Sequence, residues 1–307
     1  MTIHHRGPSI VAWAPAKLNL FFEVRARRDD GFHEIETLMV PISLYDTLRL
    51  RETPGREIEF RCAPAAGCSS SSDAWRDVPR GGENIVVQAV ELLRRRAGCE
   101  RGAAIELVKR IPSAAGLGGG SSDAAAALTA ANVLWQLDWS AARLASLAAE
   151  LGSDIPFFVH LMSGTRFSAA MCRGRGERVT PSGALAPLYC VLVRPAGGLS
   201  TAEVYRNCRV ADQPRGAESL LAALQAGAIS RAARLLYNAL EPAAAALSDS
   251  VGRLREEFER LDFLGHQLTG SGTSYFGLCR HRRHARQLAA RLRSRQLGSV
   301  YVVQTAN

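Results

Sequence analysis

The stretch that decides the fold of this chain is KRIPSAAGLGGGSSDAAAALTAANVLWQL, which runs from Lys109 to Leu137. Residues 104–110 alternate apolar and polar side chains, which predicts a strand, and residues 124–136 are rich in alanine, which predicts a helix. Between them, glycine stands at positions 116, 118, 119 and 120. Glycine is costly to order, so a loop keeps it where the backbone turns through positive φ or approaches a ligand closely.

The residues after the glycines are types that begin helices. Ser121, Ser122 and Asp123 are favoured N-cap residues, so we expect the helix to start close to them. A glycine-rich loop between a strand and a helix exposes backbone N–H groups at the positive end of the helix dipole, and this arrangement binds phosphate. The alternative is a flexible glycine turn, capped by serine, that binds nothing. Our hypothesis for the segment is phosphate binding.

Two common nucleotide-binding motifs do not fit this segment. A P-loop requires Gly-Lys-Ser/Thr at the start of the helix, and here Gly120 is followed directly by Ser121. A dinucleotide-binding fold requires an acidic residue after the next strand, yet the pattern stays helical through Leu151. If the loop binds phosphate, it does so with a different sequence pattern.

Length and composition indicate a globular protein with two domains. The 307 residues are enough for two separate cores, and 47% of them are hydrophobic. No apolar run is long enough to cross a membrane, and the start, MTIHHRGPSI, lacks the apolar core of a signal peptide, so we expect a cytoplasmic protein with no membrane partner. The seven cysteines form an odd set without a C-x-x-C pair, which indicates neither a disulfide framework nor a zinc site.

The positive charge is built almost entirely from arginine. The net charge of +9 favours an anionic partner, which is a nucleotide, a phosphorylated substrate or nucleic acid. Of the 38 basic residues only Lys17 and Lys109 are lysines. In such a background a lysine marks a place where a compact ammonium is required and a planar guanidinium does not fit.

The order of predicted elements indicates an α+β chain. Residues 10–60 hold runs of β-branched and aromatic residues, which predict an antiparallel sheet, and the serine-rich residues 64–82 predict a surface loop or insertion. The second half follows the order β, helices, β, β, α, β, which is the split pattern of ferredoxin-like domains. Its predicted strands and helices are residues 188–194, 217–263, 266–268, 274–279, 282–293 and 299–305.

Asp154 stands in LGSDIPFFV, between the end of a predicted helix and a strongly apolar stretch. One interpretation is structural, as an N-cap or first-turn carboxylate before Pro156. The other is functional: apolar neighbours would desolvate the carboxylate and raise its pKa, and a nearby cation would restore a charged base. The spacing favours neither interpretation.

Lys17 stands in APAKLNLFF, on an otherwise apolar predicted strand. Asn19 follows two residues later and therefore points to the same face of the strand. The alternative is a solvated lysine on an edge strand, which is common. The rarity of lysine in this chain and the shared face favour a functional pair.

Two further turns carry candidate site residues. The segment DGFH, residues 30–33, predicts a turn that presents Phe32 and His33, which would stack on a base and hydrogen-bond its edge, although a lone histidine is more often structural. The segment TGSGT, residues 269–273, is a second glycine-rich turn. As a hairpin loop it needs no function; facing the first glycine loop, it would close on a phosphate or a substrate.

Together these motifs resemble the GHMP kinases. The resemblance covers nearly the whole chain, in the order APAKLNLF, DGFHEIETL, ENIVVQA, IPSAAGLGGGSSDAA, LGSDIPFF and LTGSGTS. It implies an ATP-binding N-terminal domain, residues 1–170, and a ferredoxin-like C-terminal substrate domain, residues 171–307. The implied reaction transfers the γ-phosphate of ATP to the tertiary C2 hydroxyl of a methylerythritol that carries a cytidine diphosphate group, in the non-mevalonate route to isoprenoids.

The resemblance also implies a role for individual residues. Asp154 would be the catalytic base and Lys17 its partner. The implied ATP-binding residues are Asn84, Pro112, Ser113, Ala114, Ala115, Gly116, Leu117, Gly118, Gly119, Gly120, Ser121 and Ser122. The implied substrate-binding residues are Asn19, Phe32, His33, Thr201, Tyr205, Gly270, Ser271 and Gly272, with Phe32 and Tyr205 enclosing the cytosine. Mg²⁺ is expected with ATP; Ser121 or Ser122 would ligate it, and no second carboxylate ligand is identified.

The sequence departs from the family pattern in two places and leaves alternative functions open. Phe32 stands where tyrosine is frequent, and residues 63–80 form a longer insertion than usual. A kinase for another alcohol, such as homoserine or a mevalonate derivative, would share the glycine loop but lack DGFH. A nucleic-acid-binding protein would use Arg280–Arg295, which carries seven arginines, but that segment lacks aromatic residues for stacking, so nucleic acid is not expected as the main partner.

Overall fold

The chain folds into two compact units that exchange segments along the sequence. The structure, a computed structural model, describes residues 3–66, 78–79, 81–165 and 167–306. The first unit takes residues 1–16, 44–113 and 118–166, and the second takes residues 17–43, 114–117 and 167–307. Strands β2 (Ser9–Arg27) and β3 (His33–Thr53) run through both units. The proposed domain boundary at residues 170 and 171 stays a prediction.

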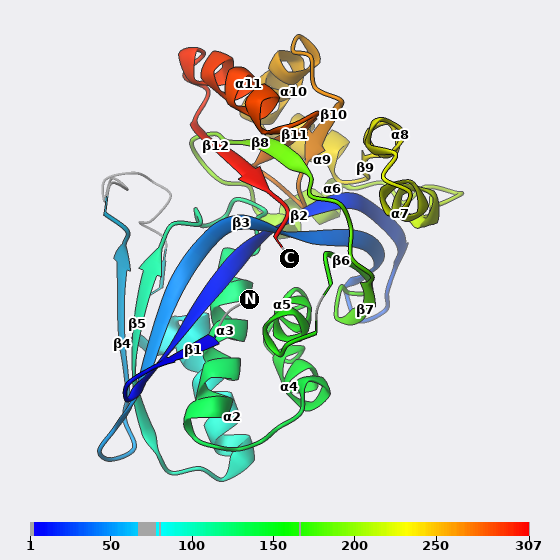
Figure 1. Ribbon diagram of the computed structural model, residues 1–307. Coiled ribbons are helices and arrows are strands. Elements are labelled where there is room, and N and C mark those ends of the chain that lie inside the picture. The colour runs from blue at the N-terminus through cyan, green and yellow to red at the C-terminus, as the bar shows by residue number, and fades with distance from the viewer. Residues whose placement is uncertain (1–2, 67–77, 80, 166, 307) are drawn as a thin grey trace. The chain divides into compact units, whose positions relative to one another are not determined.

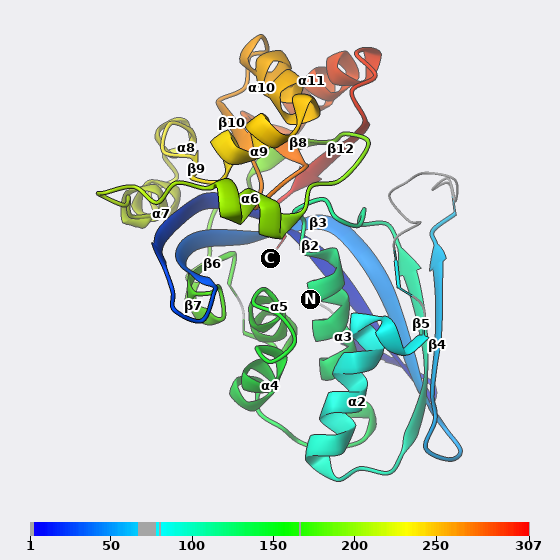
Figure 2. The same cartoon turned by 180° about the vertical axis from the view of Figure 1, so that it is seen from behind.

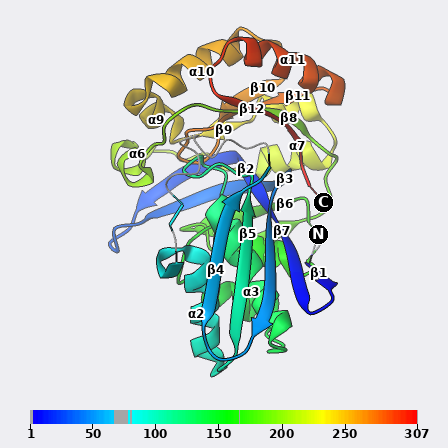
Figure 3. The same cartoon turned by 90° about the vertical axis from the view of Figure 1, so that its left-hand side faces the viewer.

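The first unit is a sheet covered by helices on one face (Figure 1, Figure 3). Its strand order is β1-β2-β3-β5-β4. Strand β1 pairs antiparallel with β2 and β3 pairs antiparallel with β5, whereas β4 and β5 run parallel. Helices α2 and α3 pack against each other behind the strands, and α5 packs on α3 and α4. The elements are β1 (Ile3–Arg6), β4 (Ile58–Pro64), the 3₁₀ turn η1 (Gly81–Glu83), α2 (Ile85–Ala97), β5 (Gly102–Lys109), α3 (Gly119–Leu134), α4 (Ala141–Ala148) and α5 (Ile155–Met162).

The glycine loop differs from its predicted form at the helix start. The helix was predicted from residue 124, but α3 begins at Gly119, and its N-cap is Gly118 with φ of 68°. Ser121, Ser122 and Asp123 are therefore inside the first turns and cap nothing. The reason is tertiary: the Asp123 carboxylate is buried against Lys109, and an N-cap in the left-handed region suits glycine. Most of the predicted insertion, residues 67–77 and 80, lies outside the described residues.

The second unit contains a four-stranded antiparallel sheet in the order β10-β11-β8-β12. With strands numbered along this part of the chain, that is the 2-3-1-4 order of a ferredoxin-like domain, so the predicted fold is confirmed. Helices α10 and α11 cover one face of the sheet (Figure 2). The elements are β8 (Tyr189–Arg194), α6 (Thr201–Asn207), α7 (Glu218–Gln225), α8 (Ile229–Ala233), β9 (Tyr237–Asn238), α9 (Glu241–Leu247), α10 (Asp249–Glu259), β10 (Gly265–Leu268), β11 (Tyr275–Cys279), α11 (Arg282–Ser294) and β12 (Ser299–Gln304).

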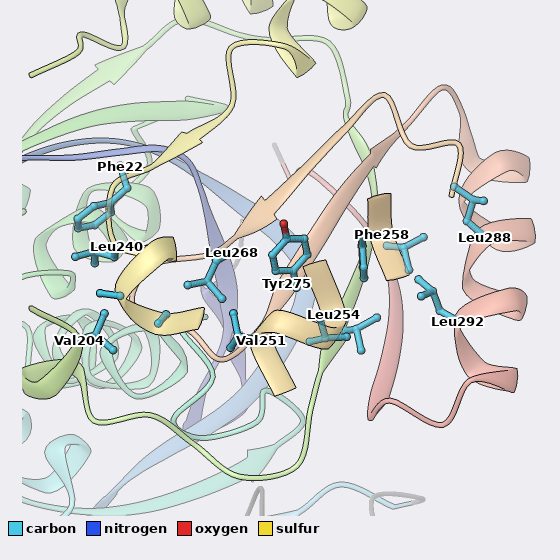
Figure 4. Close-up of a cluster of buried hydrophobic side chains, with 14 of the residues drawn as sticks. Phe22, Val204, Leu240, Val251, Leu254, Phe258, Leu268, Tyr275, Leu288 and Leu292 are labelled. Atoms are coloured by element: carbon cyan, nitrogen blue, oxygen red, sulfur yellow. The ribbon is translucent and has the colours of Figure 1, made fainter. Parts of the chain in front are cut away.

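The core of the second unit joins this sheet to the C-terminal part of β2 and the N-terminal part of β3. Figure 4 shows the cluster, in which Phe22 of β2 lies with Leu240 and Val204, and Phe258 of α10 lies with Tyr275 and Leu288. Strand β9 pairs with β2, while β6 (Ala169–Gly174) pairs with β3 and with β7 (Arg178–Ser182). The basic helix α11 buries its leucines and leaves its arginines in solvent, which is the ordinary pattern of an amphipathic surface helix.

Candidate functional site

Lys17 and Asn19 form a buried pair on β2. Lys17 is 4% exposed and Asn19 is 1% exposed, so the interpretation of Lys17 as a solvated edge lysine is wrong. The Lys17 ammonium donates a hydrogen bond to Asn19 Oδ1 over 2.6 Å. Because residues two apart on a strand share a face, the predicted pair follows from the strand itself.

The orientation of the Asn19 amide is fixed by threonines. Its Nδ2 donates to Thr37 Oγ1 over 2.8 Å, and the Thr37 hydroxyl in turn donates to the Phe21 carbonyl over 2.7 Å. On its other side, Thr269 Oγ1 accepts from Asn19 N over 3.1 Å and lies 3.3 Å from Asn19 Oδ1. With the nitrogen held by Thr37, the amide oxygen must face Lys17, so the ammonium has a fixed position.

The two glycine-rich loops pack directly against each other within the second unit. Ser274 N donates to the Ala115 carbonyl over 3.2 Å, and Lys17 N donates to the Leu117 carbonyl over 3.0 Å. A Cβ added to Gly116 would lie 2.3 Å from the Thr269 carbonyl oxygen, and one added to Gly270 would lie 3.4 Å from Lys17 Nζ. The expectation that residues 269–273 face the first glycine loop is confirmed for its residues 115–117.

The second loop is held in place by residues from one helix and one short strand. Thr201, at the start of α6, shares a hydrogen bond of 2.9 Å with Ser271, so the structure brings these two predicted substrate residues together. Asn238 on β9 donates to the carbonyls of Leu268 and Gly270 over 2.9 and 2.8 Å. Asn238 was missed by sequence reasoning, because nothing in its neighbourhood marks an amide that hydrogen-bonds a loop distant in sequence.

His33 and Tyr205 lie against each other at the start of β3. Their ring centroids are 5.0 Å apart with an angle of 34° between the planes. Among the described residues, the buried His33 Nε2 has no hydrogen-bond partner. Burial, and then the charge of Arg27, lowers the pKa of His33, so its ring is neutral at pH 7. A neutral ring with one unsatisfied nitrogen is suited to the polar edge of a ligand.

Phe32 is presented to solvent by a tight turn. Its N–H donates to Asp30 Oδ1 over 3.1 Å, and Gly31 has a φ of 83°. The ring is 49% exposed, and the guanidinium of Arg175 lies 4.7 Å from its centroid. The structure thus brings His33, rather than Phe32, next to Tyr205, and the proposed enclosure of a cytosine between Phe32 and Tyr205 stays a prediction.

The start of α3 has the features of an anion site. Gly118, the N-cap residue, has no side chain to cap the helix. The first backbone hydrogen bond of α3 runs from Ser122 N to the Gly118 carbonyl over 2.9 Å. The N–H groups before that hydrogen bond lie at the positive end of the helix dipole; they belong to Gly119, Gly120 and Ser121. The buried Ser122 hydroxyl has no hydrogen-bond partner among the described residues. Donors and an unsatisfied hydroxyl at this end fit an anion such as phosphate.

A buried ion cluster lies beside this helix start in the first unit, and sequence reasoning missed it. Lys109 Nζ is 2.5 Å from both Asp46 Oδ2 and Asp123 Oδ2. Burial alone would lower the pKa of Lys109, but the two carboxylates outweigh it and raise that pKa. Burial also raises the pKa of Asp123. The available signal was Lys109 itself, one of two lysines in an arginine-rich chain.

Two other predicted site residues stand at helix starts. Asn84 is the N-cap of α2: its Oδ1 accepts from Val86 N over 2.9 Å and its Nδ2 donates to the Pro79 carbonyl over 2.7 Å, which is a complete structural role. Asp154 holds the N-cap position of α5, yet its side chain makes no capping hydrogen bond. The role of Asp154 stays a prediction. Ile155, Phe157 and Phe158, which follow it, are fully buried.

The described part of the chain contains no candidate metal cluster and no candidate membrane-spanning helix. No group of three or more His, Cys, Asp or Glu side chains there is placed to hold a metal ion. In the same residues, every helix is too short or too polar to span a lipid bilayer.

Two protein-family models match the chain. The model described as GHMP kinases N terminal domain matches residues 84–161, which contain the glycine loop and Asp154. The model described as GHMP kinases C terminal matches residues 220–297, which contain the second glycine loop.

Curated relatives match over nearly the full length. The sequence is 43% identical over 300 residues to the 4-diphosphocytidyl-2-C-methyl-D-erythritol kinase of Pelotomaculum thermopropionicum, covering 97% of this chain and 98% of that protein. It is 42% identical to the protein of the same name from Nocardioides sp., covering 91% of each chain.

Solved structures share the fold. A 4-(cytidine 5'-diphospho)-2C-methyl-D-erythritol kinase matches with a TM-score of 0.77 and 34% identity, covering 97% of this chain and 100% of that one. A homoserine kinase from Cytophaga hutchinsonii matches with a TM-score of 0.73 and 18% identity, covering 100% and 97%, which shows a common fold.

Replacing Gly116 by alanine should destabilise the second unit through a steric overlap. Gly116 and Gly227 have similar φ values, 73° and 68°, but only Gly116 has atoms within 4 Å of an added Cβ. Both Gly116→Ala and Gly227→Ala should lose about 1–2 kcal/mol from the left-handed backbone. Gly116→Ala should lose roughly 1–3 kcal/mol more from overpacking, measured as the free energy of unfolding in urea. Equal losses of unfolding free energy in the two variants would contradict this prediction. They would show that the two glycine loops move apart without a further loss of stability.

Proposed function

This chain belongs to the 4-diphosphocytidyl-2-C-methyl-D-erythritol kinase family of the GHMP kinases, and on that premise we propose how its residues carry out the reaction. The enzyme is an ATP-dependent phosphotransferase of isoprenoid biosynthesis. It transfers the γ-phosphate of ATP to the C2 hydroxyl of 4-diphosphocytidyl-2-C-methyl-D-erythritol. The observation in the structure that carries the proposal is the buried Lys17–Asn19 pair beneath two packed glycine loops.

The ATP phosphates bind along residues 112–122. The support is the set of amides at the start of α3, which point from the positive end of the helix and have no side-chain cap. Pro112 to Leu117 lead into this turn, and the glycines allow phosphate oxygens to approach the backbone. Mg²⁺, when bound with ATP, supplies positive charge to the phosphates. The unsatisfied hydroxyl of Ser122, or that of Ser121, is its proposed protein ligand. For Asn84, contact with ATP is proposed from family likeness alone.

Asp154 is the proposed general base. A tertiary alcohol is a poor nucleophile, so a carboxylate within hydrogen-bond reach should accept its proton as the phosphoryl group arrives. Asp154 stands at the N-cap position of α5, directly before the buried Ile155, Phe157 and Phe158. Lys17, held by Asn19, is proposed to stabilise negative charge that develops on the transferring group. Its compact ammonium suits a site closed by the backbone of Gly270.

The cytidine group is proposed to bind at the start of β3. His33 Nε2 would hydrogen-bond the edge of the base, while Tyr205 and Phe32 would contact its faces. Thr201, Gly270, Ser271 and Gly272 would contact the rest of the substrate, supported by the hydrogen bond that joins Thr201 to Ser271. We also propose a cytoplasmic location, since the described cysteines are free thiols, which reducing compartments maintain.

The function is tested by ATP consumption with a panel of alcohols. The cytidylylated methylerythritol should turn over efficiently, whereas homoserine, mevalonate and methylerythritol without the cytidine diphosphate group should not. A site that hydrogen-bonds part of its substrate rejects an analogue that lacks it by a factor of about 10⁴. Comparable turnover of homoserine or mevalonate would contradict the assignment.

Asp154→Asn should lower kcat by roughly 100-fold or more while ATP still binds, because the amide keeps the shape but cannot accept the proton. The matched control is Asp249→Asn, since Asp249 is an exposed aspartate in the first turn of α10. Lys17→Arg should also be severely impaired although its charge is kept. The losses should be far from additive in the double variant. Near wild-type kcat in a folded Asp154→Asn protein would leave Asp154 a structural residue.

Phe32→Ala should weaken substrate binding by about 1–3 kcal/mol, since it removes one stacking face. His33→Ala should act in the same direction, because it leaves a cytosine edge unpaired. Steady-state KM for the substrate is the measurement, and calorimetry should show unchanged ATP binding in both variants. Trp13→Ala is the control, because Trp13 is an aromatic residue of similar exposure, 47%, in the other unit. An unchanged KM in Phe32→Ala would remove Phe32 from the site.

A further inference from the structure

Lys109 ends strand β5 at the point where the chain enters the glycine loop. Its side chain is 4% exposed, and its ammonium donates to one carboxylate on each side, both at 2.5 Å. Asp46 comes from the first-unit part of β3, and Asp123 comes from α3. One ammonium therefore links three elements of the first unit.

Asp46 also fixes the backbone that leaves β5. Its Oδ1 accepts from Arg110 N and, over 2.9 Å, from Ile111 N, while its Oδ2 accepts from Lys109. Three successive residues thus donate to a single buried carboxylate. Because each buried donor is satisfied there, the first residues of the loop have a defined direction.

Asp123 fixes the other end of the loop. It lies just after the first turn of α3 and forms an ion pair with Lys109. The turn itself rests on the same residues: a Cβ added to Gly119 would lie 2.9 Å from Ile111 Cγ2 and 3.4 Å from Lys109 Nζ. The amides at the helix start are consequently held against the end of β5.

We propose that Lys109 is a positioning residue for ATP, which ties both ends of the glycine loop through Asp46 and Asp123 and so fixes the amides that receive the phosphates. This inference rests on the proposed function only in naming ATP as the ligand. A loop rich in glycine loses much conformational freedom when it orders around a ligand, and fixing its ends in advance reduces that cost. The benefit is restraint of the loop rather than net stability, because the attraction within a buried ion pair often does not offset the cost of desolvating it.

The geometry also accounts for the second lysine of the chain. Two carboxylate oxygens 2.5 Å from one nitrogen require a compact donor that hydrogen-bonds in several directions. A guanidinium is larger and planar, so it would separate Gly119 from the end of β5. This chain uses arginine at 36 of its 38 basic positions, and Lys109 is an exception where only the ammonium fits.

The test compares nucleotide binding in variants that weaken the ion cluster of Lys109, Asp46 and Asp123 but keep the size of its side chains. Asp123→Asn and Asp46→Asn keep side-chain shape, whereas Lys109→Met leaves two buried carboxylates unpaired and risks misfolding. In each folded aspartate variant we expect the Kd of a fluorescent ADP analogue to rise about tenfold, since the loop must then order on binding. The KM for ATP should rise similarly, while the KM for the alcohol should stay within about twofold. The matched control is Glu150→Gln, which breaks the exposed Arg96–Glu150 pair of 2.7 Å and should change neither quantity.

The outcomes separate this inference from the proposed function. Wild-type nucleotide affinity in the folded aspartate variants would overturn the positioning role, whatever their thermal stability. Equal rises in the KM for ATP and for the alcohol would also overturn it, because a general loss of structure affects both. If the wild-type protein binds the ADP analogue but does not phosphorylate the alcohol, the proposed function fails, and the binding comparison still decides the role of Lys109.

Discussion

Two stretches of backbone pack directly against each other at Gly116, and the candidate site in the second unit depends on this contact. A side chain at Gly116 would overlap the backbone carbonyl of Thr269, so the two glycine loops can meet only because residue 116 has no side chain. The hydrogen bonds from Ser274 to Ala115 and from Lys17 to Leu117 then follow. Through Thr269, the same contact orients the Asn19 amide and hence the Lys17 ammonium. Backbone packing thus decides where the catalytic candidate lies.

The two lysines are buried for different physical reasons. Lys17 donates a hydrogen bond to the amide oxygen of Asn19, which orients the ammonium. Lys109 lies between the carboxylates of Asp46 and Asp123 and forms an ion pair with each. A cation between two carboxylates is largely neutralised and serves to hold the chain in place. Arginines elsewhere mostly lie at the surface, where ion pairs contribute little to stability.

Two buried polar atoms at the candidate site have no hydrogen-bond partner in the described part of the chain. Among the described residues, His33 Nε2 and Ser122 Oγ are buried and unsatisfied, although native folds satisfy nearly all such atoms. Both belong to residues that the family resemblance assigns to ligands. The unsatisfied imidazole lies beside Tyr205, and the unsatisfied hydroxyl lies in the first turn of α3. Leaving these atoms unpaired costs free energy in the unliganded protein, and a ligand that hydrogen-bonds them would remove that cost.

The sequence by itself determined the fold class, the ferredoxin-like order of the second half, the glycine loop and the Lys17–Asn19 pair, because these follow from periodicity and from spacing along one element. It placed the start of α3 too late, since serine and aspartate are local N-cap signals that the buried contact of Asp123 with Lys109 overrides. Only the tertiary structure decided that Asp46 joins Lys109, that Asn238 holds the second glycine loop, and that Tyr205 meets His33. These contacts join residues far apart in the chain, and no local pattern encodes which distant side chain fills a given buried position.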